Sequence, residues 1–181
     1  MSHLRFCFVV VLLLLSHISS LAQETLPKPR QRLWATLGVG TTTTHGWGRN
    51  LAGMLSGTFD SRHGLFAMRW LGTGKFAAEN YPFIGTGTMG ATEISGLYGI
   101  RARHKALTLS ALAGLGVVWF QRSGSYGEEA TTVLGLPLEV QLSVTSEGPV
   151  GVAVSLFGNV NSRAPYAGFM FCILIGSLKW S

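Results

Sequence analysis

Charged residues are scarce in this chain, and so are cysteines. Asp, Glu, Lys and Arg make up 12% of the 181 residues, while 24 residues are glycine and 47% are hydrophobic. A soluble domain usually carries about twice that share of charge. The two cysteines are Cys7 and Cys172. Because we expect Cys7 to leave with a cleaved leader, an intramolecular disulfide is excluded, and low charge with abundant glycine favours a protein whose outer surface faces lipid.

The first residues predict a cleaved signal peptide. Arg5 precedes the apolar run Phe6 to Leu15, and Ser20-Leu21-Ala22 has the small-x-small pattern of a cleavage site. A retained membrane anchor is the alternative, but so short an apolar run cannot span a bilayer as a helix. The expected division of the chain is a signal peptide at 1–22, a periplasmic amino-terminal segment at 23–32 and one barrel domain at 33–181.

Long hydrophobic runs are also missing beyond residue 22, and this excludes helical membrane spans. The hydrophobic period is two instead, which predicts β-strands. The expected strands are 33–42, 50–60, 64–72, 92–102, 106–121, 131–144, 150–158 and 167–180. Their connections alternate between long and short. This rhythm is typical of an all-β, eight-stranded antiparallel up-and-down barrel in an outer membrane.

Two kinds of barrel would produce such alternation. In strand 131–144, from residue 134 onward, one face carries only Leu and Val, while the other carries Gly, Pro, Glu, Gln and Ser. A secreted soluble barrel for an apolar ligand would need a charged exterior, which this chain lacks, so we expect the apolar face outside. Trp70 and Trp119 fall at the loop ends of their strands, where aromatic residues mark a membrane interface. Parity places Trp34 and Trp180 on the inner face.

Three motifs carry a resemblance to known proteins. They are Gly135-Leu136-Pro137-Leu138-Glu139, the corner Phe157-Gly158-Asn159-Val160-Asn161, and the ending with Ala167-Gly168, Cys172 and Gly176-Ser177-Leu178-Lys179. The mature chain resembles small outer-membrane barrels of the OmpA/OmpX type, and the motifs resemble uncharacterised small barrel proteins of Bacteroidota. The resemblance implies an outer-membrane location in a Gram-negative envelope, contact with membrane lipid and insertion by the barrel-assembly machinery. It implies no chemistry. One departure is that Ser181 follows Trp180, where an assembly signal usually ends on an aromatic residue.

We expect no catalytic, cofactor or metal site. Gly85 to Gly90 spells a dinucleotide fingerprint, but a strand rather than a helix follows it. His45 belongs to a long loop, whereas His63 and His104 belong to short turns at the other end, roughly 25 Å away and too far to share a metal ion. A lipid-modifying hydrolase on the outer rim stays open as an alternative. Its residues would be His45, Ser123 or Ser125, and Glu128.

Three charged residues are predicted by parity to point into the lumen: Arg69, Arg101 and Glu139. An eight-stranded barrel is only wide enough for side chains to fill, so these charges must neutralise one another or reach water. We expect Arg69 and Glu139 to meet across the lumen near mid-height, and Arg101 to lie nearer the short turns. A structural plug is the favoured interpretation, and a narrow conduit or gate is the alternative.

The two ends of the barrel differ in composition. The long loop 73–91 carries Tyr81, Pro82, Phe83 and Ile84, apolar residues that mark a candidate contact surface for a partner. At the loop end, with Glu93 counted among its acids, positive and negative charges balance. At the turn end, basic residues exceed acidic ones. That end would attract lipid phosphates or an anionic polymer, but it lacks the base-reading groups of a nucleic-acid surface. The sequence predicts a non-enzymatic barrel for envelope structure or surface recognition.

Overall fold

Eight β-strands make up nearly all of the described structure. The computed structural model describes residues 32–44, 48–61, 63–74, 89–104, 106–124, 127–145 and 149–176. The strands are β1 (Arg32–Thr44), β2 (Gly48–Ser61), β3 (Gly64–Gly74), β4 (Met89–His104), β5 (Leu107–Gly124), β6 (Gly127–Thr145), β7 (Val150–Asn161) and β8 (Tyr166–Gly176). Each predicted strand has a counterpart, and each counterpart reaches further toward the loop end than predicted. The predicted signal peptide, nearly all of segment 23–32, and strand residues 177–180 lie outside the described residues.

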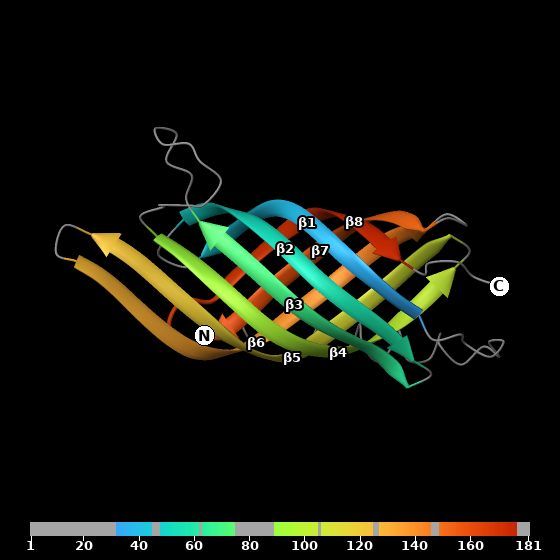
Figure 1. The fold of residues 1–181 in the computed structure, drawn as a ribbon, viewed down its shortest axis with the longest axis horizontal. Coiled ribbons are helices and arrows are strands. Elements are labelled where there is room, and N and C mark those ends of the chain that lie inside the picture. The colour runs from blue at the N-terminus through green and yellow to red at the C-terminus, as the bar shows by residue number, and fades with distance from the viewer. Residues whose placement is uncertain are drawn as a thin grey trace, which may run out of the picture.

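The strands close into one antiparallel barrel in sequence order. Every neighbouring pair is antiparallel, and β1 pairs with β8 to complete the ring, from Trp34 opposite Gly176 to Thr44 opposite Tyr166. Figure 1 shows the strands crossing the barrel axis obliquely, as closure of a sheet requires. The predicted all-β, eight-stranded fold is confirmed. In the described part of the chain, no helix has both the length and the apolarity needed to cross a membrane.

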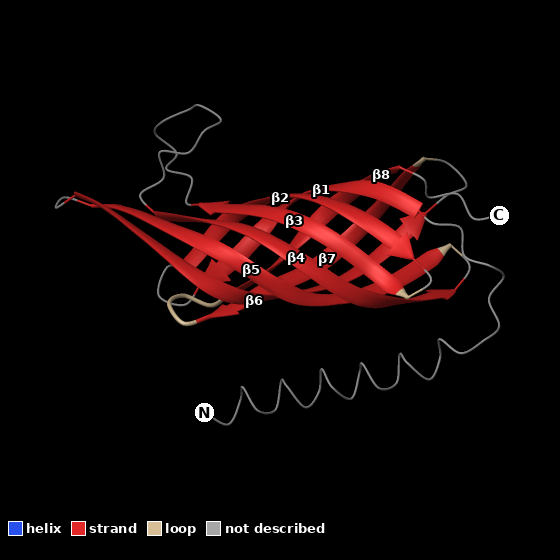
Figure 2. Ribbon diagram, turned by 60° about the horizontal axis from the view of Figure 1, so that its bottom comes forward, coloured by secondary structure: helices blue, strands red, loops and turns tan. Residues whose placement is uncertain are grey.

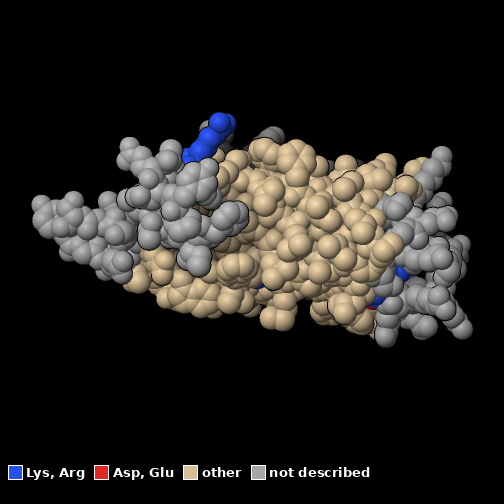
Figure 3. Space-filling model, turned by 45° about the horizontal axis from the view of Figure 1, so that its top comes forward, with Lys and Arg blue, Asp and Glu red and all other residues tan. Residues whose placement is uncertain are grey.

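Side chains alternate between the outside and the lumen because successive strand residues point to opposite faces. On β6, Leu134, Leu136, Leu138 and Val140 are exposed, and Leu134 reaches 77%. Their neighbours Pro137 and Glu139 are buried. In Figure 3 the middle of the barrel shows almost no charged atoms, and those that are visible gather toward the ends. This is the opposite of a soluble barrel, in which the apolar face is inside.

Two clusters of apolar side chains lie in the lumen, together with buried polar side chains. The smaller cluster joins Leu65, Ala67, Leu97 and Leu112, and Trp34 packs against both clusters. Trp34 therefore lies on the inner face, as parity predicts. The larger cluster comprises Ala52, Met54, Leu71, Ala91, Val118, Phe120, Ala153, Phe157, Ala164, Tyr166, Met170, Cys172 and Leu174.

Strands β5 and β6 project beyond the rest of the barrel as a two-stranded ribbon at the loop end (Figures 1 and 2). Their pairing continues to Gly124 opposite Gly127. On its other side β6 pairs with β7 only as far as Gly135 opposite Asn161. The first eight residues of β6 therefore have one partner strand among the described strands, whereas the rest of β6 has two.

Candidate functional site

A buried ionic cluster lies in the lumen around Arg69. β3 carries this residue on its inward face, and it is 1% exposed. The guanidinium donates to Oε1 of Glu93 from Nε at 3.2 Å and from Nη2 at 2.6 Å. Its Nη1 donates to Oε2 of Glu139 at 3.0 Å. Since β3 and β6 are three strands apart in the ring, the Arg69 side chain bridges the lumen.

Glu93 of β4 accepts the larger number of hydrogen bonds. Its Oε1 also accepts from Oγ of Ser95 at 2.6 Å, and its Oε2 accepts from Nδ2 of Asn159 at 2.8 Å and from the hydroxyl of Tyr166. Hydrogen bonds to a charged acceptor are the strong ones. Together with Arg69, they satisfy a carboxylate that is 1% exposed and would otherwise be costly to bury.

Glu139 of β6 has fewer partners. Its Oε1 accepts from Oγ of Ser155 at 2.9 Å, and its Oε2 accepts from Arg69. The cluster thus holds two carboxylates and one guanidinium, and its hydrogen bonds connect β3, β4, β6, β7 and β8. The arrangement links five strands across a narrow lumen, and its role is therefore structural.

The cluster is linked to the connection between β7 and β8 through two asparagines. The Nδ2 of Asn161 donates to Oδ1 of Asn159 at 3.1 Å and to the carbonyl of Ala164 at 3.2 Å. The Oδ1 of Asn161 accepts from the backbone N–H groups of Arg163, at 3.1 Å, and Ala164, at 2.8 Å. An asparagine side chain that binds its own following backbone stabilises a tight turn. The turn at the loop end is therefore tied to the ionic cluster below it.

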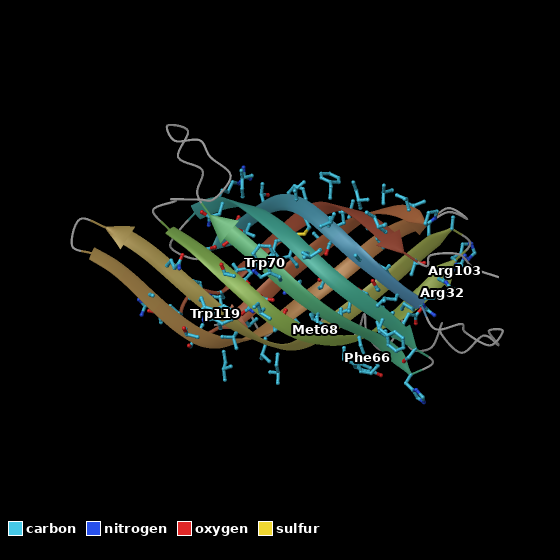
Figure 4. All side chains as sticks on the ribbon, in the orientation of Figure 1. Arg32, Phe66, Met68, Trp70, Arg103 and Trp119 are labelled. Carbon is cyan, nitrogen blue, oxygen red and sulfur yellow. The ribbon has the colours of Figure 1, made fainter. Side chains whose placement is uncertain are left out.

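A second group of charges lies in the lumen at the turn end. Arg101 forms a salt bridge with Asp60, which is buried, and Arg32 is opposite Asp60 in the register of β1 and β2. The positive charges of Arg32 and Arg103 both act on Arg101. Figure 4 shows Arg32 and Arg103 at the same end of the barrel. This end could attract anions, because Arg32, Arg101 and Arg103 outnumber Asp60, the one carboxylate among the residues described there.

The structure brings together two of the three lumen charges named from the sequence. Arg69 and Glu139 share a hydrogen bond, while Arg101 pairs with Asp60 nearer the turns. Glu93, which the sequence counts among the acids of the loop end, has its side chain in the lumen against Arg69. It shares the parity of Arg101, so the alternation of β4 could have identified it. Asn159 and Tyr166 carried no such signal, since an uncharged polar residue facing inward is ordinary in a barrel.

Other residues named from the sequence are not brought into a site. Tyr81, Pro82, Phe83 and Ile84 lie outside the described residues. So do His45 and Ser125, and the side chains of Ser123 and Glu128 are not described. His63 and His104 are exposed at the turn end. Among the described residues, no three His, Cys, Asp or Glu side chains form a group that could hold a metal ion.

Aromatic and long apolar side chains cover the outer face. Trp70 and Trp119 are exposed, and Figure 4 shows both toward the loop end, with Met68 and Phe66 nearer the turn end of β3. Phe66 also stacks on Tyr98, with ring centroids 4.9 Å apart. The exposed charged residues in the described part of the chain lie at or beyond strand ends: Arg49, Arg103 and Arg163.

The same fold occurs in solved structures of bacterial surface proteins. Neisserial surface protein A matches with a TM-score of 0.60 and 11% identity, over 80% of this chain and 96% of that one. Ail, the attachment invasion locus protein of Yersinia pestis, matches with a TM-score of 0.57 and 11% identity, over 83% and 99% of the two chains. A major outer membrane protein from Thermus thermophilus matches with a TM-score of 0.58 and 8% identity, over 82% and 100%.

These matches define a class by fold. The chain has the architecture of the small eight-stranded barrels that are found in outer membranes, of the OmpA/OmpX-like kind. No protein-family model matches the sequence, and no curated protein matches it. At such low identities the likeness shows the fold alone.

Proposed function

We propose that this protein is a non-enzymatic barrel of a Gram-negative outer membrane, exported by the signal peptide 1–22, with a role in envelope structure or surface recognition. The observation that carries the proposal is the combination of an apolar exterior with a buried ionic lumen. Leu, Val, Ile and Phe side chains cover all eight strands from outside. So large an exposed apolar surface is unfavourable in water and matches the acyl chains of a bilayer.

The dimensions support the same location. About 11 residues per strand at ~3.3 Å each, tilted by about 40–45°, span roughly 25 Å, which is the height of the apolar band in such barrels. Trp70 and Trp119 lie on the outer face toward the loop end, where aromatic side chains would mark the boundary of that band. Kinship with the small barrels of Bacteroidota remains part of this proposal and rests on the sequence motifs.

The lumen supports a structural rather than a conducting role. Arg69, Glu93 and Glu139 are buried and bonded to one another, and the apolar clusters fill the lumen beside them. An interior of this kind is packed like a protein core. The conduit alternative requires the Arg69 hydrogen bonds to open, and planar-bilayer recordings would detect it as discrete current steps.

The loop end supports recognition. The β5–β6 ribbon extends beyond the other strands at the loop end. The loop 73–91, with its apolar residues Tyr81 to Ile84, would contribute a second contact surface. The strands that this loop joins, β3 and β4, end at the same end of the barrel as the ribbon, so a partner on the cell surface could reach both.

Membrane fractionation with a heat-modifiability gel tests the location. We expect the protein in the outer-membrane fraction, with a gel mobility that differs before and after boiling, because folded outer-membrane barrels resist the detergent. A protein found in the soluble periplasmic or secreted fraction would overturn the proposal and restore the soluble ligand-binding alternative.

A lipid hydrolysis assay tests the enzymatic alternative. Purified protein would be incubated with lipopolysaccharide and with phospholipid, and released fatty acids would be measured. We expect no release above that of a boiled sample. Release that disappears in Ser123→Ala or Ser125→Ala would show that the protein is a lipid-modifying enzyme built on the rim set with His45 and Glu128.

A further inference from the structure

Charged and polar side chains form one layer of the lumen next to the short turns. We call it the turn-end layer, and its members are Arg32, Trp34, Asp60, Arg101, Arg103 and Thr108. The strand register brings them together, because Arg32 is opposite Asp60 and Arg103 is opposite Thr108. The salt bridge between Arg101 and Asp60 joins β4 to β2 past the intervening strand. By alternation along their strands, all of these residues have inward-facing positions.

The layer has an apolar boundary on one side and water on the other. Trp34 packs against the smaller apolar cluster, which β3, β4 and β5 contribute, so its indole reaches from β1 toward the opposite wall of the lumen. Toward the turns, Arg103 is exposed and the side chain of Arg101 is 18% exposed. Figure 4 shows Arg32 and Arg103 at this end of the barrel. A small ion can therefore reach the layer from the turn end.

Positive charge exceeds negative charge in this layer. Its three arginines face one described carboxylate, that of Asp60. Arg32 acts electrostatically on Arg103, and both act on Arg101. Like charges in a partly buried site repel one another more strongly than they do in water. The residues of this end that lie outside the described ranges are also more basic than acidic in sequence. An anion in the layer would relieve this repulsion.

Two neutral donors belong to the same layer. Among the described residues, neither the indole N–H of Trp34 nor the hydroxyl of Thr108 has a hydrogen-bond partner, and both polar atoms are buried. A buried donor without an acceptor is unfavourable. Because β1 and β5 are four strands apart in a ring of eight, the two donors come from opposite walls. An acceptor near the lumen axis would lie between them.

We propose that the turn-end layer binds a phosphate group through its three arginines, with the indole N–H of Trp34 and the hydroxyl of Thr108 as further donors. A guanidinium is a planar fork that matches the oxygens of phosphate. A phosphate monoester carries nearly two negative charges and three strong acceptor oxygens. A carboxylate has one charge and two oxygens. Phosphate therefore matches both the surplus of charge and the number of donors.

Two sources on the periplasmic side carry this group. One is the headgroup of a phospholipid in the inner leaflet, which lies at the height of the short turns. The other is a soluble phosphate ester. The chemistry at the turn-end layer is the same for both. That this end faces the periplasm rests on the proposed function, whereas binding of phosphate to the purified protein does not.

The indole N–H of Trp34 reports directly on the layer. Full-length protein in maltoside micelles, which contain no phosphate, would be titrated with inorganic phosphate while the indole N–H signals are recorded by NMR. Trp34→Phe assigns the signal. Sodium acetate at the same ionic strength is the control anion, because it screens charges equally. We expect a saturable shift of the Trp34 signal in phosphate and little shift in acetate.

Three variants make the test specific. Arg103→Gln removes an exposed guanidinium, and Thr108→Val removes the hydroxyl with little change of shape. Arg49→Gln is the matched control, because Arg49 is exposed at the loop end and the change in net charge is the same. We expect phosphate to bind about tenfold more weakly to Arg103→Gln, about threefold more weakly to Thr108→Val, and unchanged to Arg49→Gln. Heat modifiability of each variant reports separately on the folding of the barrel.

Lipid nanodiscs distinguish the two sources. A Trp34 signal already at its phosphate-bound position in phosphatidylglycerol nanodiscs assigns the group to the lipid, whereas a signal that moves only when phosphate is added assigns it to a soluble ester. No shift in phosphate, an equal shift in acetate, or equal weakening in Arg103→Gln and Arg49→Gln would overturn the inference. An equal shift in acetate would point to the carboxylates of a cell-wall polymer instead. Recovery of the protein from a soluble fraction of the cell would contradict the proposed function and leave the micelle titration unaffected.

Discussion

The side chain of Asn159 of β7 packs directly against the backbone of Gly135 of β6, in the position that a side chain at residue 135 would occupy. A Cβ atom on residue 135 would lie 2.2 Å from Oδ1 and 2.6 Å from Nδ2 of Asn159. Glycine at this position therefore lets the asparagine cross toward β4 and donate to Glu93. Gly135 and Asn159 belong to two of the sequence motifs named above, 135–139 and 157–161. The contact shows that these two motifs pack against each other in the lumen.

Replacing that glycine should disturb the ionic cluster. Gly135→Ala should displace Asn159 and remove its hydrogen bond to Glu93, at a cost of about 1–3 kcal/mol in the free energy of unfolding. Urea unfolding from lipid vesicles would measure it. Gly96→Ala is the matched control, because no atom lies within 4 Å of a Cβ there.

A rescue variant separates crowding from a general effect of alanine. Asn159→Ala vacates the space, so Gly135→Ala should cost much less in the Asn159→Ala background than in the wild type. Additive losses in the double variant would show that residues 135 and 159 do not compete.

The three charges of the cluster should contribute unequally to stability. Arg69→Met leaves two buried carboxylates without their cation and should cost most, about 3–5 kcal/mol. Glu93→Gln should cost less, and Glu139→Gln least, because Glu93 accepts from four side chains and Glu139 from two. Urea unfolding of the three variants would give the order directly.

Compensation should require both carboxylates to be removed. Arg69→Met with Glu139→Leu still leaves Glu93 buried without its guanidinium, so this pair should recover little. Adding Glu93→Leu should recover much of the loss, since an apolar replacement of a whole buried ion group is often tolerated. Full recovery in the double variant would mean that Glu93 is not bonded to Arg69 in solution.

The barrel could be predicted from the sequence because its main signal is local. Alternation in 131–144 fixes which side chains face out, and the loop lengths fix the order of the strands. Which side chains meet within the lumen depends on the shear of the barrel, that is, on how far neighbouring strands are offset along their length. The alternation within one strand does not reveal this offset. Parity could therefore place Arg69 and Glu139 inside, but it could not show that Glu93 reaches the same guanidinium.

The projecting ribbon is another feature that the sequence underestimates. The sequence predicts a strand that begins at residue 131, four residues later than β6 begins. The segment Gly127-Glu128-Glu129-Ala130 has neither clear alternation nor strong strand propensity. It is a strand because β5 supplies a long partner, and such tertiary support leaves little trace in the local pattern.

Shortening the long loop should leave the barrel folded. Replacing residues 76–88 by a short turn should change unfolding little, because loop length affects stability only weakly. Surface adhesion through Tyr81 to Ile84 should disappear. Heat modifiability and cell-surface binding would be measured on the same variant. Failure to fold would show that the loop caps the barrel.

Arginine on the outer face should be costly in proportion to its depth. Leu138 lies in the part of β6 that pairs with both neighbours, whereas Leu134 lies in the ribbon beyond β7. Leu138→Arg should therefore cost roughly 2–4 kcal/mol if it lies near the bilayer midplane, and Leu134→Arg about 0–1 kcal/mol near the interface. Unfolding from vesicles would compare the two variants.

Spin labels at Leu138 and at the inward-facing Gln141 add an independent measure, because oxygen concentrates in lipid. High oxygen accessibility at 138 but not at 141 is expected, and a label at 138 that is accessible to water instead would contradict the membrane location.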